Sequence, residues 1–223
     1  GYAQEDNAVP AAPPASELTL LTMLEQGGVI LYCILGLGFL ALVLTFYLLF
    51  TLTPGREVPK KLLRRATAQL EEGDLRAVYT MVEDRDELLA RVLRAGLRAA
   101  GRDRHIVQEA MESEGQRGAT ALWQRITYLN NIATIAPLLG LLGTVWGMMQ
   151  AFSAIHFDTS EVRNLAMAYS VSTAMVTTAA GLVLAIPAKL VYYYLRGRVI
   201  STVATLEAEA AEMLEHIVAR GQS

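Results

Sequence analysis

Hydroxyl side chains interrupt the stretch STAMVTTAAGLVLAIPAK, residues 172–189, which is otherwise apolar enough to be a membrane span. A helix that only anchors a protein in a bilayer does not need them, because a hydroxyl bonded to a neighbouring helix contributes only about 0.6–2 kcal/mol. Hydroxyls can instead support water, or a carboxyl group of another chain, without the cost of a charge of their own. This stretch therefore predicts a wet or partner-facing surface within the membrane.

A second uncharged stretch, NNIATIAPLLGLLGTVWGMMQAF at residues 130–152, carries polar groups at steps of three and four residues. Such steps bring side chains onto one face of a helix. Three helices of one chain can hardly enclose such a surface, so we expect a homo-oligomer. For any single threonine, the alternative to facing water or a partner is that its hydroxyl bonds to its own helix or to a neighbouring helix. The hydroxyls expected on the polar surface are Thr134, Thr144, Ser170, Thr173, Thr177 and Thr178.

Glycines and prolines in the same two stretches predict close helix packing and bends. Small residues repeated along a helix allow another backbone to approach closely. A proline inside a helix removes one backbone hydrogen-bond donor, so Pro137 and Pro187 are expected to kink their helices. The glycines expected at close helix contacts are Gly140, Gly143, Gly147 and Gly181.

Three runs of the 223-residue chain lack Asp, Glu, Lys and Arg altogether. Each run supplies the roughly 20 helical residues needed to cross a hydrocarbon core of about 30 Å. The other interpretation, buried helices of a soluble protein, fits poorly with 53% hydrophobic residues. We therefore predict an all-α membrane protein with three transmembrane helices and long cytoplasmic helical extensions. The predicted spans are residues 27–53, 129–155 and 165–188.

Basic residues are distributed unevenly along the chain. Of the 19 Lys and Arg residues, 14 lie from Arg56 to Arg125, and none precedes Arg56. Four more follow the third span, whereas Arg163 alone falls between the second and third spans. Lys and Arg near span ends mark the cytoplasmic side of a membrane. We therefore predict a periplasmic N-terminus and periplasmic turn at 156–164, with a cytoplasmic loop at 54–128 and a cytoplasmic tail at 189–223.

The segments before and between the first two spans have their own patterns. Residues 1–15 are rich in Pro and Ala and are expected to be disordered. Residues 16–26 suggest a short amphipathic helix at the outer membrane surface. Within the loop, a turn at Gly73-Asp74 separates two short helices. A helix from about His105 is expected to continue into the second span, for about 75 Å in all.

The tail is predicted to form a long helix that packs against the helices of the loop. Its apolar residues alternate in steps of four and three, which is the pattern of a heptad seam. Glutamates cover its other faces. The residues of this seam are Val199, Val203, Leu206, Ala210, Met213 and Ile217.

The sequence holds no recognisable catalytic or metal-binding set. Cys33 is the single cysteine and is expected to be a packing residue in the first span. His105, His156 and His216 are scattered at or beyond helix ends. No nucleophile–base set, phosphate-binding loop or metal-ligand spacing occurs. We therefore expect no enzyme, no cofactor, no metal site and no nucleic-acid partner.

Two segments, APLLGLLGTVWGMMQAF (136–152) and TTAAGLVLAIPA (177–188), resemble the MotA/TolQ/ExbB proton channel family, most closely its ExbB branch. The three-span layout, the large inside loop and the outside N-terminus extend this similarity over nearly the whole chain. The resemblance implies an inner-membrane complex in which five copies surround two copies of an ExbD-like partner, each with one span and a protonatable Asp. Proton flow would drive a motion that a TonB-like protein transmits to outer-membrane transporters.

The resemblance also assigns roles to individual residues. Thr144 in GTVWG and Thr178 in TTAAG match the family's pore-facing threonines, so the polar surface would line a proton pathway. Thr173 stands where ExbB proteins of the best-known type carry a Glu, and Tyr169 where they often have Pro. No span of this chain contains an acid, so the titrating group would have to come from the partner.

Other roles stay open beside an ExbB-like subunit. A TolQ-like subunit in envelope maintenance is a close variant of it, and neighbouring genes would separate the two. A flagellar stator fits less well, because that branch has four spans and this chain shows three. A non-conducting membrane scaffold belongs to a different class and would use the hydroxyls for helix packing alone.

Overall fold

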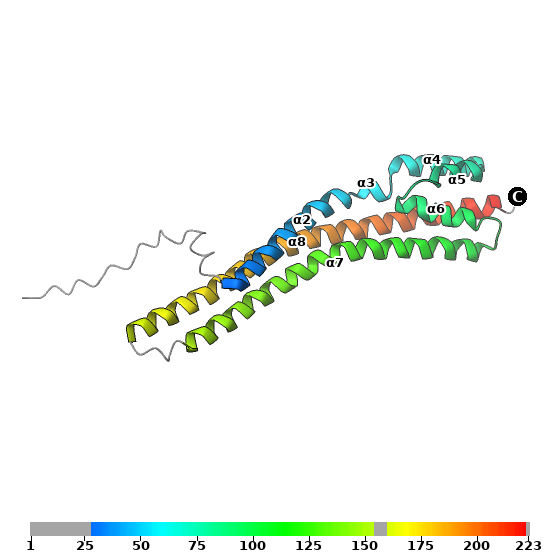
Figure 1. Cartoon of the computed structure of the whole chain (residues 1–223). Helices are drawn as coiled ribbons and strands as arrows, with labels where there is room; N and C mark the ends of the chain where they lie inside the picture. Colours follow the sequence, from blue (N-terminus) through cyan, green and yellow to red (C-terminus); the bar gives the residue numbers. More distant parts are fainter. Residues whose placement is uncertain (1–27, 154–159, 222–223) are drawn as a thin grey trace, which may run out of the picture. The chain divides into compact units, whose positions relative to one another are not determined.

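The computed structural model describes residues 28–153 and 160–221, and every regular element within them is an α-helix (Figure 1). The all-α prediction is therefore confirmed. The segments 1–15 and 16–26, and residues 154–159, lie outside the described residues. In chain order the helices are α2 (Gly28–Thr51), α3 (Pro54–Glu57), α4 (Lys60–Glu72), α5 (Leu75–Val82), α6 (Leu88–Arg98), α7 (Arg104–Ser153) and α8 (Ser160–Gly221).

Three of these helices, α2, α7 and α8, are long and apolar enough to cross a membrane. The rest of the chain covers little of them: 17% of the apolar segment is buried in α2, 33% in α7 and 28% in α8. Exposed apolar surface of this extent requires lipid or further protein around it. The chain is therefore a membrane protein whose spans contact more than their own chain.

The helix α8 begins earlier than the sequence predicts. The expected third span starts at residue 165 after a turn at 156–164, but the structure already starts the helix at Ser160. Glu161 lies in the first turn. An acidic side chain there interacts favourably with the positive end of the helix dipole, which favours this earlier start.

Both long helices continue past their apolar segments. The helix α7 has 50 residues and starts one residue before the predicted His105, and α8 has 62 residues. Pro137 lies inside α7 and Pro187 inside α8, and neither helix ends there. A proline removes one backbone hydrogen bond from a helix. The hydrogen bonds on either side of each proline are therefore enough to keep the helix continuous.

The turn predicted at Gly73-Asp74 separates α4 from α5. Gly73 has φ 87°, in the left-handed region, and its N–H donates to the carbonyl oxygen of Leu70 at 3.1 Å. Glycine adopts this conformation at little cost and so commonly ends helices. The Asp74 carboxylate then accepts a hydrogen bond from the Ala77 N–H at 2.9 Å, which caps the start of α5.

The chain divides into two compact units. Within the described residues, the first comprises residues 28–36 and 136–183 and is called the span unit. The second comprises residues 37–135 and 184–221 and is called the bundle unit. Each long helix contributes residues to both units.

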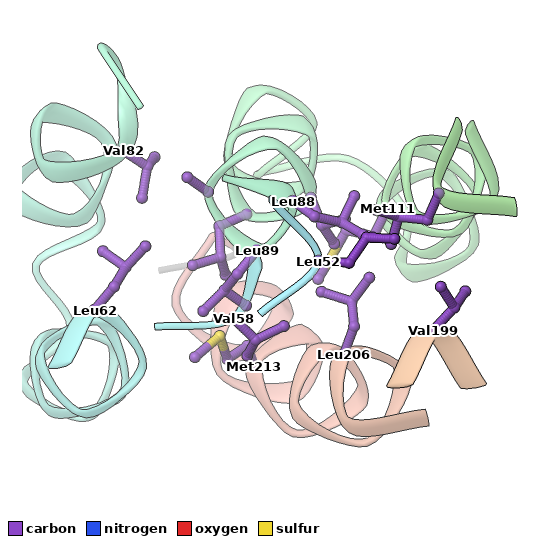
Figure 2. Close-up of a cluster of buried hydrophobic side chains, with 14 of the residues drawn as sticks. Leu52, Val58, Leu62, Val82, Leu88, Leu89, Met111, Val199, Leu206 and Met213 are labelled. Atoms are coloured by element: carbon purple, nitrogen blue, oxygen red, sulfur yellow. The ribbon is translucent and has the colours of Figure 1, made fainter. Parts of the chain in front are cut away.

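An apolar core fills the bundle unit. Side chains from α4, α5, α6, α7 and α8 belong to it, together with residues at the end of α2. A core built from so many separate segments buries a large apolar area, which is the main stabilising contribution to folding. Figure 2 shows part of this core, including Leu62, Val82, Leu89, Met111, Leu206 and Met213.

The heptad seam predicted along the tail forms one wall of this core. Val199, Leu206, Met213 and Ile217 are buried, and Val203 and Ala210 are half-buried. Glu207, Glu212 and Glu215 are exposed on the other faces. The predicted seam is therefore confirmed.

We predict that Ile217→Ala lowers the free energy of unfolding by about 2–5 kcal/mol, because the side chain is fully buried and its removal leaves a cavity. Ile106→Ala is the matched control, since it removes the same atoms from a residue that is 39% exposed. It should lower the free energy of unfolding by less than about 1 kcal/mol. Thermal unfolding of the full chain in mild detergent, followed by circular dichroism, measures both. Equal losses would contradict the role of α8 in this core.

Candidate functional site

In the span unit, α7 and α8 pack with their backbones in contact. A methyl group added at Gly181 of α8 would lie 2.6 Å from the carbonyl oxygen of Ala136 on α7. One added at Gly140 of α7 would lie 2.9 Å from the Cα of Thr178. Backbone atoms cannot move aside as a flexible side chain can. The two helices therefore approach this closely only because glycine stands at these positions.

Gly143 and Gly147 extend the same contact along α7. Gly143 faces the side chain of Thr177, and a methyl group there would overlap it. A methyl group at Gly147 would lie 2.7 Å from the Cβ of Ala174 and 2.8 Å from the carbonyl oxygen of Ser170. The glycines singled out in the sequence thus all lie at the contact between α7 and α8.

Three α8 hydroxyls lie at this contact and find hydrogen-bond acceptors there. Thr178 Oγ1 donates to the carbonyl oxygen of Gly140 at 2.9 Å, across the two helices. Ser170 and Thr177 are buried and donate to carbonyl oxygens of their own helix, at 2.9 and 2.8 Å. Ser170 and Thr177 therefore bond to their own helix, as expected if these hydroxyls served only helix packing.

Thr173 differs from these three. Its Oγ1 is buried and has no hydrogen-bond partner in the part of the chain that the structure describes. An unpaired hydroxyl in an apolar environment costs about 1–3 kcal/mol. The Thr173 hydroxyl therefore has hydrogen-bonding capacity that the described part of its own chain does not use.

The two α7 threonines lie in different units. Thr144 is half-buried in the span unit and donates to the carbonyl oxygen of Leu141 at 2.7 Å. Thr134 is exposed in the bundle unit and donates to the carbonyl oxygen of Asn130 at 2.9 Å. The structure thus groups Thr144 with the four α8 hydroxyls in one unit and leaves Thr134 out of that unit.

A polar pair that the sequence analysis did not single out joins α7 to α8 in the bundle unit. Lys189 Nζ donates to Asn130 Oδ1 at 2.7 Å and lies 5.8 Å from the centre of the Tyr192 ring. Lys189 is the first charged residue after the uncharged run 164–188. That position marks it as a residue at a span end, but only the packing of the two helices identifies Asn130 as its partner.

Cys33, predicted to be a packing residue, does not pack within the described part of its own chain. Its thiol is exposed on α2, because the apolar segment of that helix is only 17% buried within the chain. Among the described residues, no three His, Cys, Asp or Glu side chains gather in a way that could hold a metal ion.

Comparison with known proteins relates this site to a family. The family model described as the MotA/TolQ/ExbB proton channel family matches residues 84–208, more than half of the chain. The matched region contains the contact between α7 and α8 and all six hydroxyls predicted on the polar surface.

Individual relatives are similar over different shares of the chain. The biopolymer transport protein ExbB of Salmonella typhimurium is 29% identical over 214 residues, which cover 89% of this chain and 86% of that protein. The Tol-Pal system protein TolQ of Haemophilus influenzae is 37% identical over 90 residues, 40% of this chain and 39% of that protein. The biopolymer transport protein ExbB of Neisseria gonorrhoeae is 44% identical over 78 residues, 34% of this chain and 35% of that protein.

Gly181→Ala is predicted to destabilise the span unit by about 1–3 kcal/mol, because the added methyl group meets a backbone oxygen. Gly36→Ala in α2 is the matched control, since a methyl group there meets nothing within 4 Å. In a helix that control should be neutral or stabilising by up to about 1 kcal/mol. Thermal unfolding in mild detergent compares the two variants. If Gly181→Ala is as stable as Gly36→Ala, the contact does not depend on glycine.

Proposed function

Because the chain belongs to the MotA/TolQ/ExbB proton channel family, we propose that it is an ExbB-like subunit of a bacterial inner-membrane proton channel, which couples the proton motive force to TonB-dependent transport at the outer membrane. The observation that carries this proposal is the family match over residues 84–208, which includes the contact between α7 and α8. A TolQ-type role is the second candidate, since the Salmonella ExbB is 29% identical over 89% of the chain and the Haemophilus TolQ is 37% identical over 40% of it.

Conduction needs a group that takes up and releases a proton inside the membrane. The run 164–188 contains no carboxylate, and threonine hydroxyls do not ionise near neutral pH. An ExbD-like partner with one membrane span would therefore bring an Asp to this surface. A charged side chain at the centre of a membrane helix costs about 2.5–3.5 kcal/mol on insertion scales. Polar groups around the carboxylate reduce that cost, and this is the role proposed for the threonines.

Two hydroxyls support this role in complementary ways. The Oγ1 of Thr173 has hydrogen-bonding capacity that the described residues do not use, and a turn of this half-buried side chain toward the surface would let it donate to a carboxylate or to a water. Thr178 gives its proton to the carbonyl oxygen of Gly140, which leaves its own oxygen able to accept from a protonated Asp or a water. One threonine thus suits the charged form of the acid and the other its neutral form.

The proposal includes an assembly of several chains. The family resemblance implies five copies of this chain around two partner chains, with a TonB-like protein receiving the motion. Support comes from the small share of each apolar segment, 17–33%, that one chain buries. In a homo-oligomer, neighbouring copies and lipid would cover the remainder.

The proposed orientation has a periplasmic N-terminus and a cytoplasmic C-terminus, because 14 of the 19 Lys and Arg residues lie from Arg56 to Arg125. In a Cys33→Ser background, Pro10→Cys should react with a membrane-impermeant maleimide in intact cells, and Asp103→Cys should react only after lysis. Asp103 is exposed between α6 and α7, so burial would not explain its protection. Labelling of position 103 from outside would contradict this orientation.

The threonines are tested by Thr144→Val and Thr178→Val, which keep the side-chain shape and remove one hydroxyl each. Assembly should remain, while proton flux in liposomes with the partner should fall by roughly tenfold per hydroxyl, which corresponds to losing one hydrogen bond of about 1.4 kcal/mol. The double variant should lose the most. The chain alone should conduct few protons, and flux should vanish when the partner's Asp is changed to Asn.

Thr127→Val and Thr205→Val are matched controls for the two helices. Both threonines are exposed and donate to a carbonyl oxygen of their own helix, as Thr144 does. Their flux should equal that of the wild type. Strong flux through the chain alone would show that no partner carboxylate is needed. Full activity of the double Thr144 and Thr178 variant would indicate that these hydroxyls serve helix packing alone.

A further inference from the structure

The end of the third span and the part of α8 that follows it expose an apolar face in the bundle unit. Ile186 is 60% exposed, Leu190 66% and Tyr193 55%, and they follow one another in steps of four and three residues. They therefore lie on one side of the helix. The next step of four leads to Gly197, where an added methyl group would meet nothing within 4 Å. The apolar face thus ends at a position with open space above the backbone.

Three cations without acidic partners lie along the same part of α8 as this open position. Arg196 and Arg198 flank Gly197 in the sequence, so their side chains leave the helix about 100° to either side of it. Lys189 lies one helical turn before Tyr193. The segment of α8 between Glu161 and Glu207 contains no acidic residue. In the part of the chain that the structure describes, none of these three cations forms an ion pair.

Neutral groups hold two of these cations in place. Arg198 donates to the hydroxyl of Tyr194, lies 4.6 Å from the centre of that ring, and reaches the carbonyl oxygen of Leu52 at 3.5 Å. Lys189 is held by Asn130 at 2.7 Å. Carbonyl, amide and phenol groups orient a cation without neutralising it. The positive charge therefore remains available to an anion.

We propose that this face of α8 binds an anionic phospholipid, with the phosphate at Gly197 between Arg196 and Arg198 and an acyl chain along Tyr193, Leu190 and Ile186. Tyrosines and basic residues together are typical of the level of the lipid headgroups. A free phosphate would use the cations but not the exposed apolar face. An acidic protein segment could bind the cations, but it would not require an apolar face that continues into the uncharged span. The proposal requires only that α8 crosses a membrane and does not rest on proton conduction.

Native mass spectrometry of the full chain in mild detergent tests the proposal, with dioleoylphosphatidylglycerol and dioleoylphosphatidylcholine added as competing lipids. The wild type should retain the anionic lipid preferentially. In Arg196→Gln/Arg198→Gln this preference should fall about fivefold for each arginine lost. Arg64→Gln/Arg65→Gln is the matched control, because it removes two positive charges as well, but from exposed arginines of α4 outside the proposed site. Its preference should equal that of the wild type.

Two further variants test the site without changing any charge. Gly197→Trp fills the open space and should weaken retention of the anionic lipid, whereas Gly197→Ala should retain it. Unchanged retention in Gly197→Trp would overturn the proposal, even if the double arginine variant does not fold. So would an equal loss in the α4 control, which would indicate net charge alone. Displacement of the lipid by millimolar glycerol phosphate would overturn the lipid as ligand and assign the site to a soluble phosphate.

Discussion

The backbone contact between α7 and α8 is the constraint on which the rest of the membrane region depends. Lipid tails are as apolar as leucine, so only close packing and hydrogen bonds hold two spans together. Glycines at 140, 143, 147 and 181 permit the packing, and the bond from Thr178 to Gly140 crosses it. The hydroxyls of α8 are consequently positioned by two backbones, which hold them more firmly than a layer of long side chains would.

The same two helices are stabilised by different interactions in the two units. In the part of α8 that follows the predicted third span, the contacts use large side chains such as Leu206, Met213 and Ile217, because burial of apolar area away from water drives packing there. Within the predicted second and third spans this driving force is absent, and small residues take their place. The change of residue size along α7 and α8 therefore follows the change of solvent expected along them.

The sequence predicts most of the fold because its strongest signals, composition and spacing, can be read along the chain without knowing which helices are neighbours. Uncharged runs locate the spans, and heptad spacing locates the buried seam of α8. Periodicity states which residues share a face, but it does not state which neighbour that face meets. For this reason the sequence predicts the six hydroxyls as one surface, whereas the structure places Thr134 in a different unit from the others and turns Thr177 onto Gly143. The pairing of Lys189 with Asn130 depends on the same missing information.

The charge pattern of α8 makes the activity of this chain depend on its surroundings. Between Glu161 and Glu207 the helix carries hydroxyls and cations but no carboxylate. An acid of its own in the span would repel a second acid nearby and would need a proton or a cation to remain there. Without one, α8 offers hydrogen bonds within the span and positive charge beyond it, both of which suit a negative group from outside. On the function proposed above, the chain supplies the environment for a proton carrier, and the carrier itself comes from a partner chain.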